Sequence, residues 1–145
     1  MQINIDWLAR ELRIQPLSKE HREALDSAFE AEFIPQGIPI IHQHTSAQHL
    51  YILHSGSLRV VLKNNSHIVT LNSSSHNRTF GEISFFGDEP ATANVLAEQP
   101  CEVYKISCAK FRWLMQQHSD LAMKLMAYVL RSMGKVIRSM DNARH

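Results

Sequence analysis

The sequence predicts an α+β protein in which helices flank a double-stranded β-helix (jelly-roll) barrel. Apolar residues recur with helical spacing over 1–32 and again over 107–142, whereas residues 33–106 contain short apolar runs separated by polar, glycine-containing turns. With 145 residues, of which 44% are hydrophobic and 20% charged, the chain has the composition of one domain with a buried core. We therefore predict a single domain over residues 1–145.

The N-terminal segment predicts two short helices. In DWLARELRI, Leu8 and Leu12 fall on one face of a helix. In the segment that follows, Ser18 is a suitable N-cap, because its hydroxyl can accept a hydrogen bond from a free N–H group of the first helical turn. Leu25 and Phe29 then supply the apolar face of the second helix.

The central segment predicts the strands of the barrel. In SLRVVLK, Leu58 and Val60 point to one face and Arg59 points to the other, which is the alternation of a strand with one buried face. HLYILH is apolar on both faces, so we predict that it forms a central strand.

Two helices are predicted after the barrel. Ser107 can cap the first, and Ser119 or Asp120 can cap the second, which extends to about Met140. A helix of about 20 residues is roughly 30 Å long at 1.5 Å per residue, which is longer than a cover for this barrel needs to be. Two apolar stripes run along it, a heptad seam of Ala122, Met126, Val129, Met133, Val136 and Met140 and a neighbouring stripe of Leu121, Leu125, Leu130 and Ile137.

Two stripes on one helix predict two apolar contacts. We expect the neighbouring stripe to pack on the barrel and the heptad seam to form a homodimer with a second copy of the chain. The alternative is that the whole helix packs on the sheet.

The stretch FGEISFFGDEPATANV, from Phe80 to Val95, carries the candidate site. Gly81 allows a ligand to approach the backbone closely, and the Glu82 carboxylate can accept hydrogen bonds from hydroxyl groups. A glycine followed by an acid at the end of a polar loop therefore suits a ribose or a phosphate. The alternative is a tight turn with a solvated glutamate.

The order of these segments resembles the cyclic-nucleotide-binding domain family, which includes the catabolite activator proteins and the regulatory subunit of cyclic-AMP-dependent protein kinase. The resemblance covers about Leu17 to Met140: helices, short strands with a glycine at Gly56, an FGE triplet with a proline nine residues past Gly81, and a long helix. The phosphate-binding cassette of the family reads FGE, a short helical turn and then PRAATV. FGEISFFGDEPATANV keeps that length without a gap.

The resemblance implies a role for each matching position of the cassette. In the family, the glycine and the next backbone amides approach the ligand, and the glutamate binds the ribose 2′-hydroxyl. An arginine pairs with the cyclic phosphate, and the small residue after it adds a hydrogen bond. By position, the implied ligand-binding residues are Gly81, Glu82, Ile83, Ser84, Ala91 and Thr92.

Ala91 stands where the family has its arginine. The loss of one charge-assisted contact between guanidinium and phosphate is worth roughly 1.5–3 kcal/mol, or about 10- to 150-fold in affinity. Thr92 and Asn94 can offer neutral hydrogen bonds, and Arg78 is a candidate for a replacement counter-charge. We therefore expect the fold of the family with weak or absent binding of cyclic AMP (cAMP) or cyclic GMP (cGMP).

The histidines predict an alternative function for a similar barrel. From Gly37 to Gly56 the pattern G-x4-H-x-H-x4-H-x6-G, with His42, His44 and His49, resembles the first motif of the metal-binding cupin family. Histidines at positions i and i+2 of a strand point to one face and can chelate Zn²⁺ or Fe²⁺ together. However, the first gap is one residue short and the second cupin motif is missing, so our expectation is no metal.

Composition and motifs argue against several other functions. The formal net charge of +1 gives no strong field that would attract nucleic acid or a membrane. The sequence has no GxSxG elbow, P-loop or CxxC motif, which predicts that the chain is not an enzyme. Two cysteines, together with Asp6 where a signal peptide needs an apolar run, predict a cytoplasmic protein.

The resemblance also bears on the output of the domain. Catabolite activator proteins have a DNA-binding helix-turn-helix after the long helix, whereas here only a few residues follow it. We therefore expect a regulatory or sensor module that does not bind DNA and that acts through its homodimer on a separate, unknown partner protein.

Overall fold

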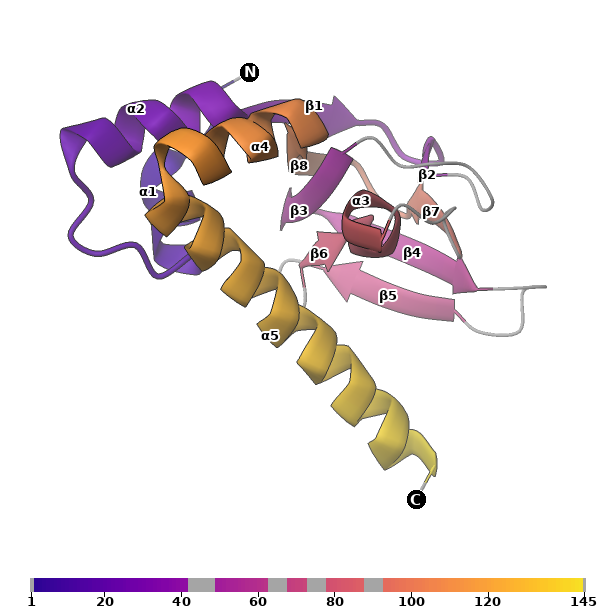
Figure 1. Ribbon diagram of the computed structural model, residues 1–145. Helices are drawn as coiled ribbons and strands as arrows, with labels where there is room; N and C mark the ends of the chain where they lie inside the picture. Colours follow the sequence, from indigo (N-terminus) through magenta and orange to yellow (C-terminus); the bar gives the residue numbers. More distant parts are fainter. Residues whose placement is uncertain (1, 42–48, 63–67, 73–77, 88–92, 145) are drawn as a thin grey trace.

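The computed structural model describes residues 2–41, 49–62, 68–72, 78–87 and 93–144, and Figure 1 shows how the helices and strands are arranged. In chain order the elements are α1 (Ile5–Glu11), α2 (Lys19–Ala28), β1 (Phe29–Ile34), β2 (Pro39–Ile41), β3 (His49–Ser55), β4 (Ser57–Leu62), β5 (Ile68–Asn72), β6 (Thr79–Phe80), α3 (Glu82–Gly87), β7 (Ala93–Ala97), β8 (Cys101–Ser107), α4 (Cys108–Gln117) and α5 (Ser119–Arg144).

The strands form two four-stranded antiparallel sheets. Sheet A has the order β1-β8-β3-β6, and sheet B has the order β2-β7-β4-β5. Two such sheets with flanking helices confirm the predicted α+β, jelly-roll fold class. The stretch HLYILH is confirmed as a central strand, because β3 lies between β8 and β6 and its Leu50, Ile52 and Leu53 are completely buried.

The apolar core has two parts, one on each face of sheet A. On one face, Leu50 and Tyr104 pack among side chains of α1, α2, α4 and α5. On the other face, Leu53 and Val103 pack against Leu58 of sheet B. The helices therefore cover one face of sheet A, and the interior of the barrel lies on the other.

Polar side chains fix the starts of three helices. The hydroxyl of Ser18 accepts a hydrogen bond from the N–H of His21 at 3.0 Å, and the hydroxyl of Ser107 accepts one from the N–H of Lys110 at 3.1 Å. The side chain of Asn4 caps α1 in the same way. The predicted N-caps Ser18 and Ser107 are confirmed, because each satisfies an N–H group that the first helical turn leaves free.

The first strand begins earlier than the sequence predicts. Phe29, predicted to lie in the second helix, is the first residue of β1 and pairs with Ile106 of β8. Its side chain is buried in the core between sheet A and the helices. Sheet pairing with a distant strand therefore overrides the helical spacing that Phe29 shares with Leu25.

The long helix α5 uses a different face from the predicted one. Ala122 and Val129, expected in the heptad seam, are buried in the core of the domain, as is Leu125 of the neighbouring stripe. Both stripes thus contribute to the core, because α5 packs on the domain along a broad apolar face. The prediction that Ala122 and Val129 face a partner is wrong.

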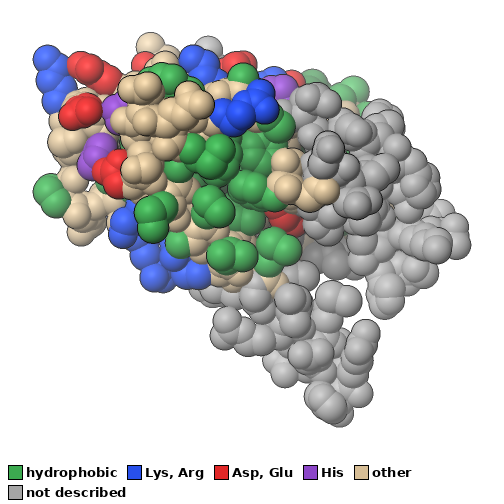
Figure 2. Space-filling model, in the orientation of Figure 1, with side chains coloured by type: hydrophobic (Ala, Val, Ile, Leu, Met, Phe, Trp, Pro, Cys, Tyr) green, Lys and Arg blue, Asp and Glu red, His purple; other side chains and the backbone are tan. Residues whose placement is uncertain are grey.

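The exposed apolar side chains of α5 form a separate stripe. Met123, Met126 and Leu130 are 69%, 42% and 66% exposed, respectively. Figure 2 shows hydrophobic side chains gathered over α4 and α5 in the middle of the face that it displays. Figure 1 shows the C-terminal part of α5 extending away from the sheets. The seam positions Val136 and Met140 have side chains outside the described part of the chain.

Among the described residues, no helix has both the length and the apolar character that a membrane span requires.

Candidate functional site

The candidate site begins at Gly81, where β6 turns into α3. Gly81 has a φ angle of +83°, a conformation that strongly favours glycine. A Cβ atom at this position would lie 3.0 Å from the carbonyl oxygen of His49, 3.3 Å from the side chain of Ile41 and 3.4 Å from that of Tyr51. Both conformation and space therefore require a glycine, and the backbone of the cassette lies tightly against the start of β3.

Glu82 places a carboxyl group in the first turn of α3. Its Oε2 atom is buried and has no hydrogen-bond partner among the described residues. Burial raises the pKa of the Glu82 carboxyl, and a hydrogen bond with its own backbone N–H offsets only part of that rise. A buried carboxylate oxygen that lacks a donor is unfavourable, so this position suits a ligand that donates a hydrogen bond.

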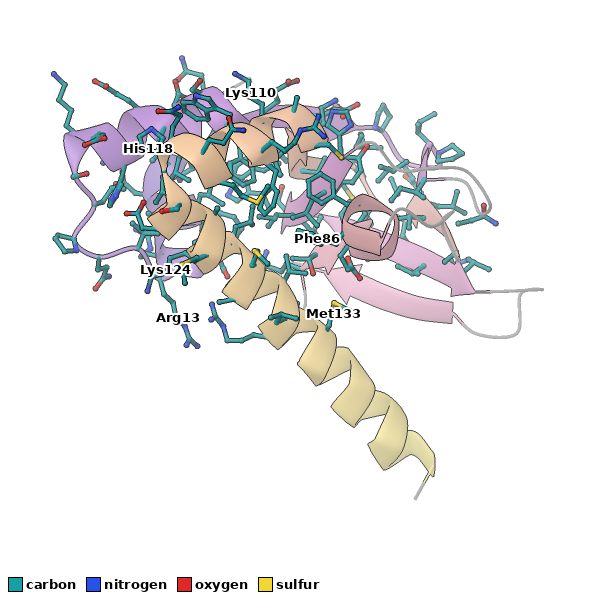
Figure 3. All side chains as sticks on the ribbon, in the orientation of Figure 1. Arg13, Phe86, Lys110, His118, Lys124 and Met133 are labelled. Carbon is teal, nitrogen blue, oxygen red and sulfur yellow. The ribbon has the colours of Figure 1, made fainter. Side chains whose placement is uncertain are left out.

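Aromatic side chains pack on both sides of the turn from β6 into α3. Tyr51 of β3 stacks on Phe80 with ring centroids 4.8 Å apart and nearly parallel planes. Phe85 and Phe86 of α3 each contact the ring of Phe111 in α4, at centroid distances of 5.7 and 5.4 Å. Figure 3 shows Phe86 between α3 and the two C-terminal helices. The short helix is therefore anchored to sheet A on one side and to α4 on the other.

The structure describes part of the predicted cassette. Gly81 and Glu82 form the turn, and Ile83 and Ser84 continue it as backbone of the first turn of α3. The side chains of Ile83 and Ser84 lie outside the described part of the chain, as do Ala91 and Thr92 altogether. The ligand roles of these six positions remain predictions.

Arg78, the candidate replacement counter-charge, points elsewhere. Its Nη1 atom donates hydrogen bonds to the carbonyl oxygens of Leu53 and His54 at 3.0 and 3.2 Å. Its guanidinium also pairs with Glu11 of α1 and lies 5.4 Å from the centroid of the Trp7 ring. These contacts hold Arg78 at the end of β3 and against α1, so the structure does not support a role for it at the cyclic phosphate.

The histidine site of the cupin alternative is not supported. His42 and His44 lie outside the described residues, and His49 stands at the start of β3 beside Tyr51. Burial and the nearby charge of Lys105 lower the pKa of His49. Within the part of the chain that the structure describes, no group of three or more His, Cys, Asp or Glu side chains is arranged to hold a metal ion.

Sequence reasoning missed two residues beside the cassette. Tyr51 stacks on Phe80 and lies beside Gly81. In the sequence it stands far upstream of the cassette, in an apolar run, and no motif there points to a binding site. Thr79 is buried in β6, and its hydroxyl has no hydrogen-bond partner among the described residues. In the sequence, only its position directly before the FGE triplet could have indicated that Thr79 lies beside the candidate site.

The geometry defines a jelly-roll barrel with a tight glycine turn from β6 into α3, and comparison with known proteins identifies the family. The family model described as cyclic nucleotide-binding domain matches residues 31–118. Because this match spans more than half of the chain, the protein belongs to the cyclic nucleotide-binding domain family, and it has the regulatory type of domain that this family comprises.

The curated relatives are transcriptional regulators. The chain is similar to proteins named cAMP-activated global transcriptional regulator CRP from Pasteurella multocida, at 33% identity over 110 residues, and from Escherichia coli, at 34% identity over 110 residues. Each alignment covers 74% of this chain but only 53% and 52% of the respective relative. The chain thus spans about half the length of the curated relatives that it matches.

Solved structures show the same fold. A cyclic nucleotide-binding domain from Methylobacillus flagellatus matches with a TM-score of 0.80 and 16% identity, covering 93% of this chain and 79% of that one. The catabolite activator protein of Thermus thermophilus matches with a TM-score of 0.70 and 23% identity, covering 92% of this chain and 63% of that one. At these identities the likeness concerns the fold alone.

Proposed function

We propose that this chain is a sensor module that binds a cyclic nucleotide at the turn from β6 into α3, with weakened affinity because Ala91 replaces the cassette arginine. The observation that carries the proposal is the buried Oε2 atom of Glu82, which has no donor among the described residues. In this role the domain is neither an enzyme nor a DNA-binding unit.

The energetics favour a ligand hydroxyl at Glu82. A buried polar atom left without a partner costs about 1–3 kcal/mol, and more when it is charged. The 2′-hydroxyl of a ribose would donate to the carboxylate and offset that cost. The tight packing of Gly81 on His49 and Tyr51 holds the turn in place before any ligand arrives.

The proposal names cAMP as the first ligand and cGMP as its competitor. The curated relatives are named as cAMP-activated, and their identity to this chain exceeds 30%. The purine is not distinguished by Glu82, because both nucleotides carry the same ribose 2′-hydroxyl. The phosphate would be held by backbone N–H groups without an arginine, which lowers affinity by roughly 10- to 150-fold relative to a cassette that has one.

Calorimetric titration of cAMP and cGMP tests this proposal. We expect the unmodified chain to bind weakly and Ala91→Arg to bind about 10- to 150-fold more tightly, because it restores the counter-charge. Gln99→Arg, which adds the same charge in the exposed turn between β7 and β8, is the matched control and should leave affinity unchanged. Absence of binding in both the unmodified chain and Ala91→Arg would contradict the proposed function, and a Kd below about 1 μM for the unmodified chain would contradict the weakened site.

We also propose that the chain forms a homodimer through α5 and passes its signal to a separate partner protein. The exposed stripe of Met123, Met126 and Leu130 supports this, since apolar side chains at spacings of three and four residues along one helix suit a second helix. Figure 1 shows that the helix continues beyond the sheets.

Sedimentation of the double variant Met126→Glu/Leu130→Glu tests the dimer. Two buried charges in an apolar interface are strongly unfavourable, so we expect a folded monomer. Lys124→Glu changes an exposed charge on the same helix without touching the stripe, and it should remain dimeric. A dimer that persists in the double variant excludes this interface.

A further inference from the structure

A group of basic side chains lies where the end of α1 meets α5. Figure 2 shows Lys and Arg side chains gathered beside α5 at the lower left of the face that it displays, and Figure 3 shows the labelled side chains of Arg13 and Lys124 in that region. Leu12 and Ile14, on either side of Arg13 in the sequence, pack in the same core as Leu125 of α5. The packing of these two elements therefore brings Arg13 to the flank of α5.

Two further basic residues, Lys124 and Arg131, lie on one flank of α5. They are nearly two full turns apart, so they project from the same side of the helix, and a rise of 1.5 Å per residue places their Cα atoms about 10 Å apart. Lys124 is exposed and Arg131 is half-buried. The apolar stripe with Met126 and Leu130 lies on a different side of the helix, so the proposed dimer contact does not use these cations. Arg13, Lys124 and Arg131 together are called the basic flank.

The carboxylates that come next to the basic flank in the sequence have other partners. Asp120 stands about one turn before Lys124, but its Oδ2 atom lies 2.7 Å from Nε2 of His21 in α2. Glu11, at the end of α1, pairs with Arg78 at 3.8 Å. Within the described part of the chain, the three side chains of the basic flank therefore have no ion pair.

The backbone of Arg13 has a conformation that favours a different residue. Arg13 follows the C-cap of α1 with a φ angle of +58°. Its N–H donates to the carbonyl of Arg10 at 3.1 Å, and the N–H of Ile14 donates to the carbonyl of Ala9 at 2.9 Å. Helices that end in this way usually have glycine at this position, because a Cβ atom disfavours the left-handed conformation. The stability of the fold thus gives no reason for an arginine here, whereas a binding partner for its side chain does.

We propose that the basic flank is the docking surface for an acidic segment of the separate partner protein, with carboxylates about 10 Å apart. Guanidinium groups bind carboxylates through paired, charge-assisted hydrogen bonds. Carboxylates at every third residue of an extended segment have the required separation, at about 3.3 Å per residue. A nucleic acid duplex carries one charge per about 1.7 Å, so it fits a longer and denser basic surface than these three cations provide. This docking surface rests on the proposed output through a partner protein, but it does not depend on nucleotide binding.

Fluorescence anisotropy with an acidic peptide tests the docking surface. The probe is a fluorescein-labelled peptide of four Glu-Ser-Gly repeats, titrated with the full chain at low salt, where exposed charges are screened least. We expect Arg13→Gln/Arg131→Gln to weaken binding about five- to tenfold, because two charge pairs are lost. Lys110→Gln/Arg112→Gln removes the same charge from α4 and is the matched control, with a change of less than about twofold. Equal weakening by the two double variants, or no binding of the peptide to the unmodified chain, would overturn the proposal.

Arg13→Gly separates a binding role of Arg13 from a structural one. Glycine removes both the side chain and the unfavourable backbone conformation, so the unfolding equilibrium constant should fall about three- to fivefold while the peptide binds about two- to threefold more weakly. A loss of stability, or unchanged affinity for the peptide, would show that Arg13 serves the fold and overturn its place in the docking surface.

A short DNA duplex, labelled in the same way, tests the chemical class of the partner. We expect it to bind more weakly than the peptide, and tighter binding that Arg13→Gln/Arg131→Gln abolishes would assign the basic flank to phosphate and overturn the proposal. A failed nucleotide titration would refute the sensor function and leave these results standing.

Discussion

Two glycine turns lie near opposite ends of β3, and they differ in what surrounds them. Gly56 follows the end of the strand with a φ of +99°, and a Cβ atom there would lie 2.4 Å from the carbonyl oxygen of Pro100. The thiol beside it is paired, since Cys101 donates to the carbonyls of Ser57 and Gln99 at 3.2 and 3.0 Å, and the buried Nδ1 of His54 lies 3.6 Å from the Glu102 carboxylate without a hydrogen bond. At this end of β3, backbone and side-chain atoms of Pro100 and Cys101 fill the space beside the glycine.

Gly81 packs against the start of β3 with a φ of +83°, but its neighbours are not all paired. The hydroxyl of Thr79 and the Oε2 atom of Glu82 are buried without partners among the described residues. Native interiors satisfy nearly all buried polar atoms, so two adjacent exceptions call for an explanation. We therefore propose that the same sequence signal, a glycine after a strand, marks a structural turn at Gly56 and a ligand site at Gly81.

Alanine at each glycine gives the largest expected effects. Gly56→Ala forces a Cβ atom against fixed backbone atoms in a left-handed conformation and should cost about 3 kcal/mol or more, or prevent folding. Gly81→Ala meets less severe contacts and should cost about 1–2 kcal/mol. Urea unfolding measures both. If Gly81→Ala lowered the free energy of unfolding as much as Gly56→Ala or more, the cassette turn would be as important for the stability of the fold as the Gly56 turn.

Glu82→Gln should have a smaller effect, and one that depends on pH. Because burial raises the folded-state pKa of Glu82, the folded chain holds its proton more tightly than the unfolded chain does. The stability that this contributes is present below the ordinary carboxyl pKa of about 4.5 and is lost as pH rises through the raised value. At neutral pH we therefore expect Glu82→Gln to be more stable than the unmodified chain by about 1 kcal/mol.

Unfolding in urea between pH 4 and pH 7 would show this difference growing with pH. Glu23→Gln removes an exposed carboxylate of α2 and serves as the control, with no such growth expected. A difference that shrinks as pH rises would mean that Glu82 is satisfied in the folded chain, and the contrast between the two ends of β3 would disappear.

Local features of the fold could be predicted from the sequence. The caps Ser18 and Ser107, the central strand HLYILH and the glycine at Gly81 depend on neighbouring residues, so short patterns reveal them. The face of α5 could not be predicted in the same way. Periodicity shows that apolar stripes exist, but only packing on sheet A and α4 decides that Ala122 and Val129 are buried while Leu130 is exposed.

Pairs between distant residues also escaped sequence reasoning. Arg78 was predicted only as a candidate counter-charge, and its partner Glu11 lies far upstream in the sequence, at the end of α1. Likewise, the sequence places Glu82 after Gly81 but says nothing about the burial of its oxygen. Pairing and desolvation depend on the assembled fold, so they become visible only in three dimensions.

The most direct test of the central claim is calorimetric comparison of cAMP with 2′-deoxy-cAMP in the Ala91→Arg background, where affinity is expected to be highest. Loss of one hydrogen bond to a carboxylate should weaken the 2′-deoxy nucleotide about 10-fold or more when Glu82 is present. With Glu82→Leu added, the two nucleotides should bind equally, because no acceptor remains. Equal binding of the two nucleotides while Glu82 is present would contradict the account.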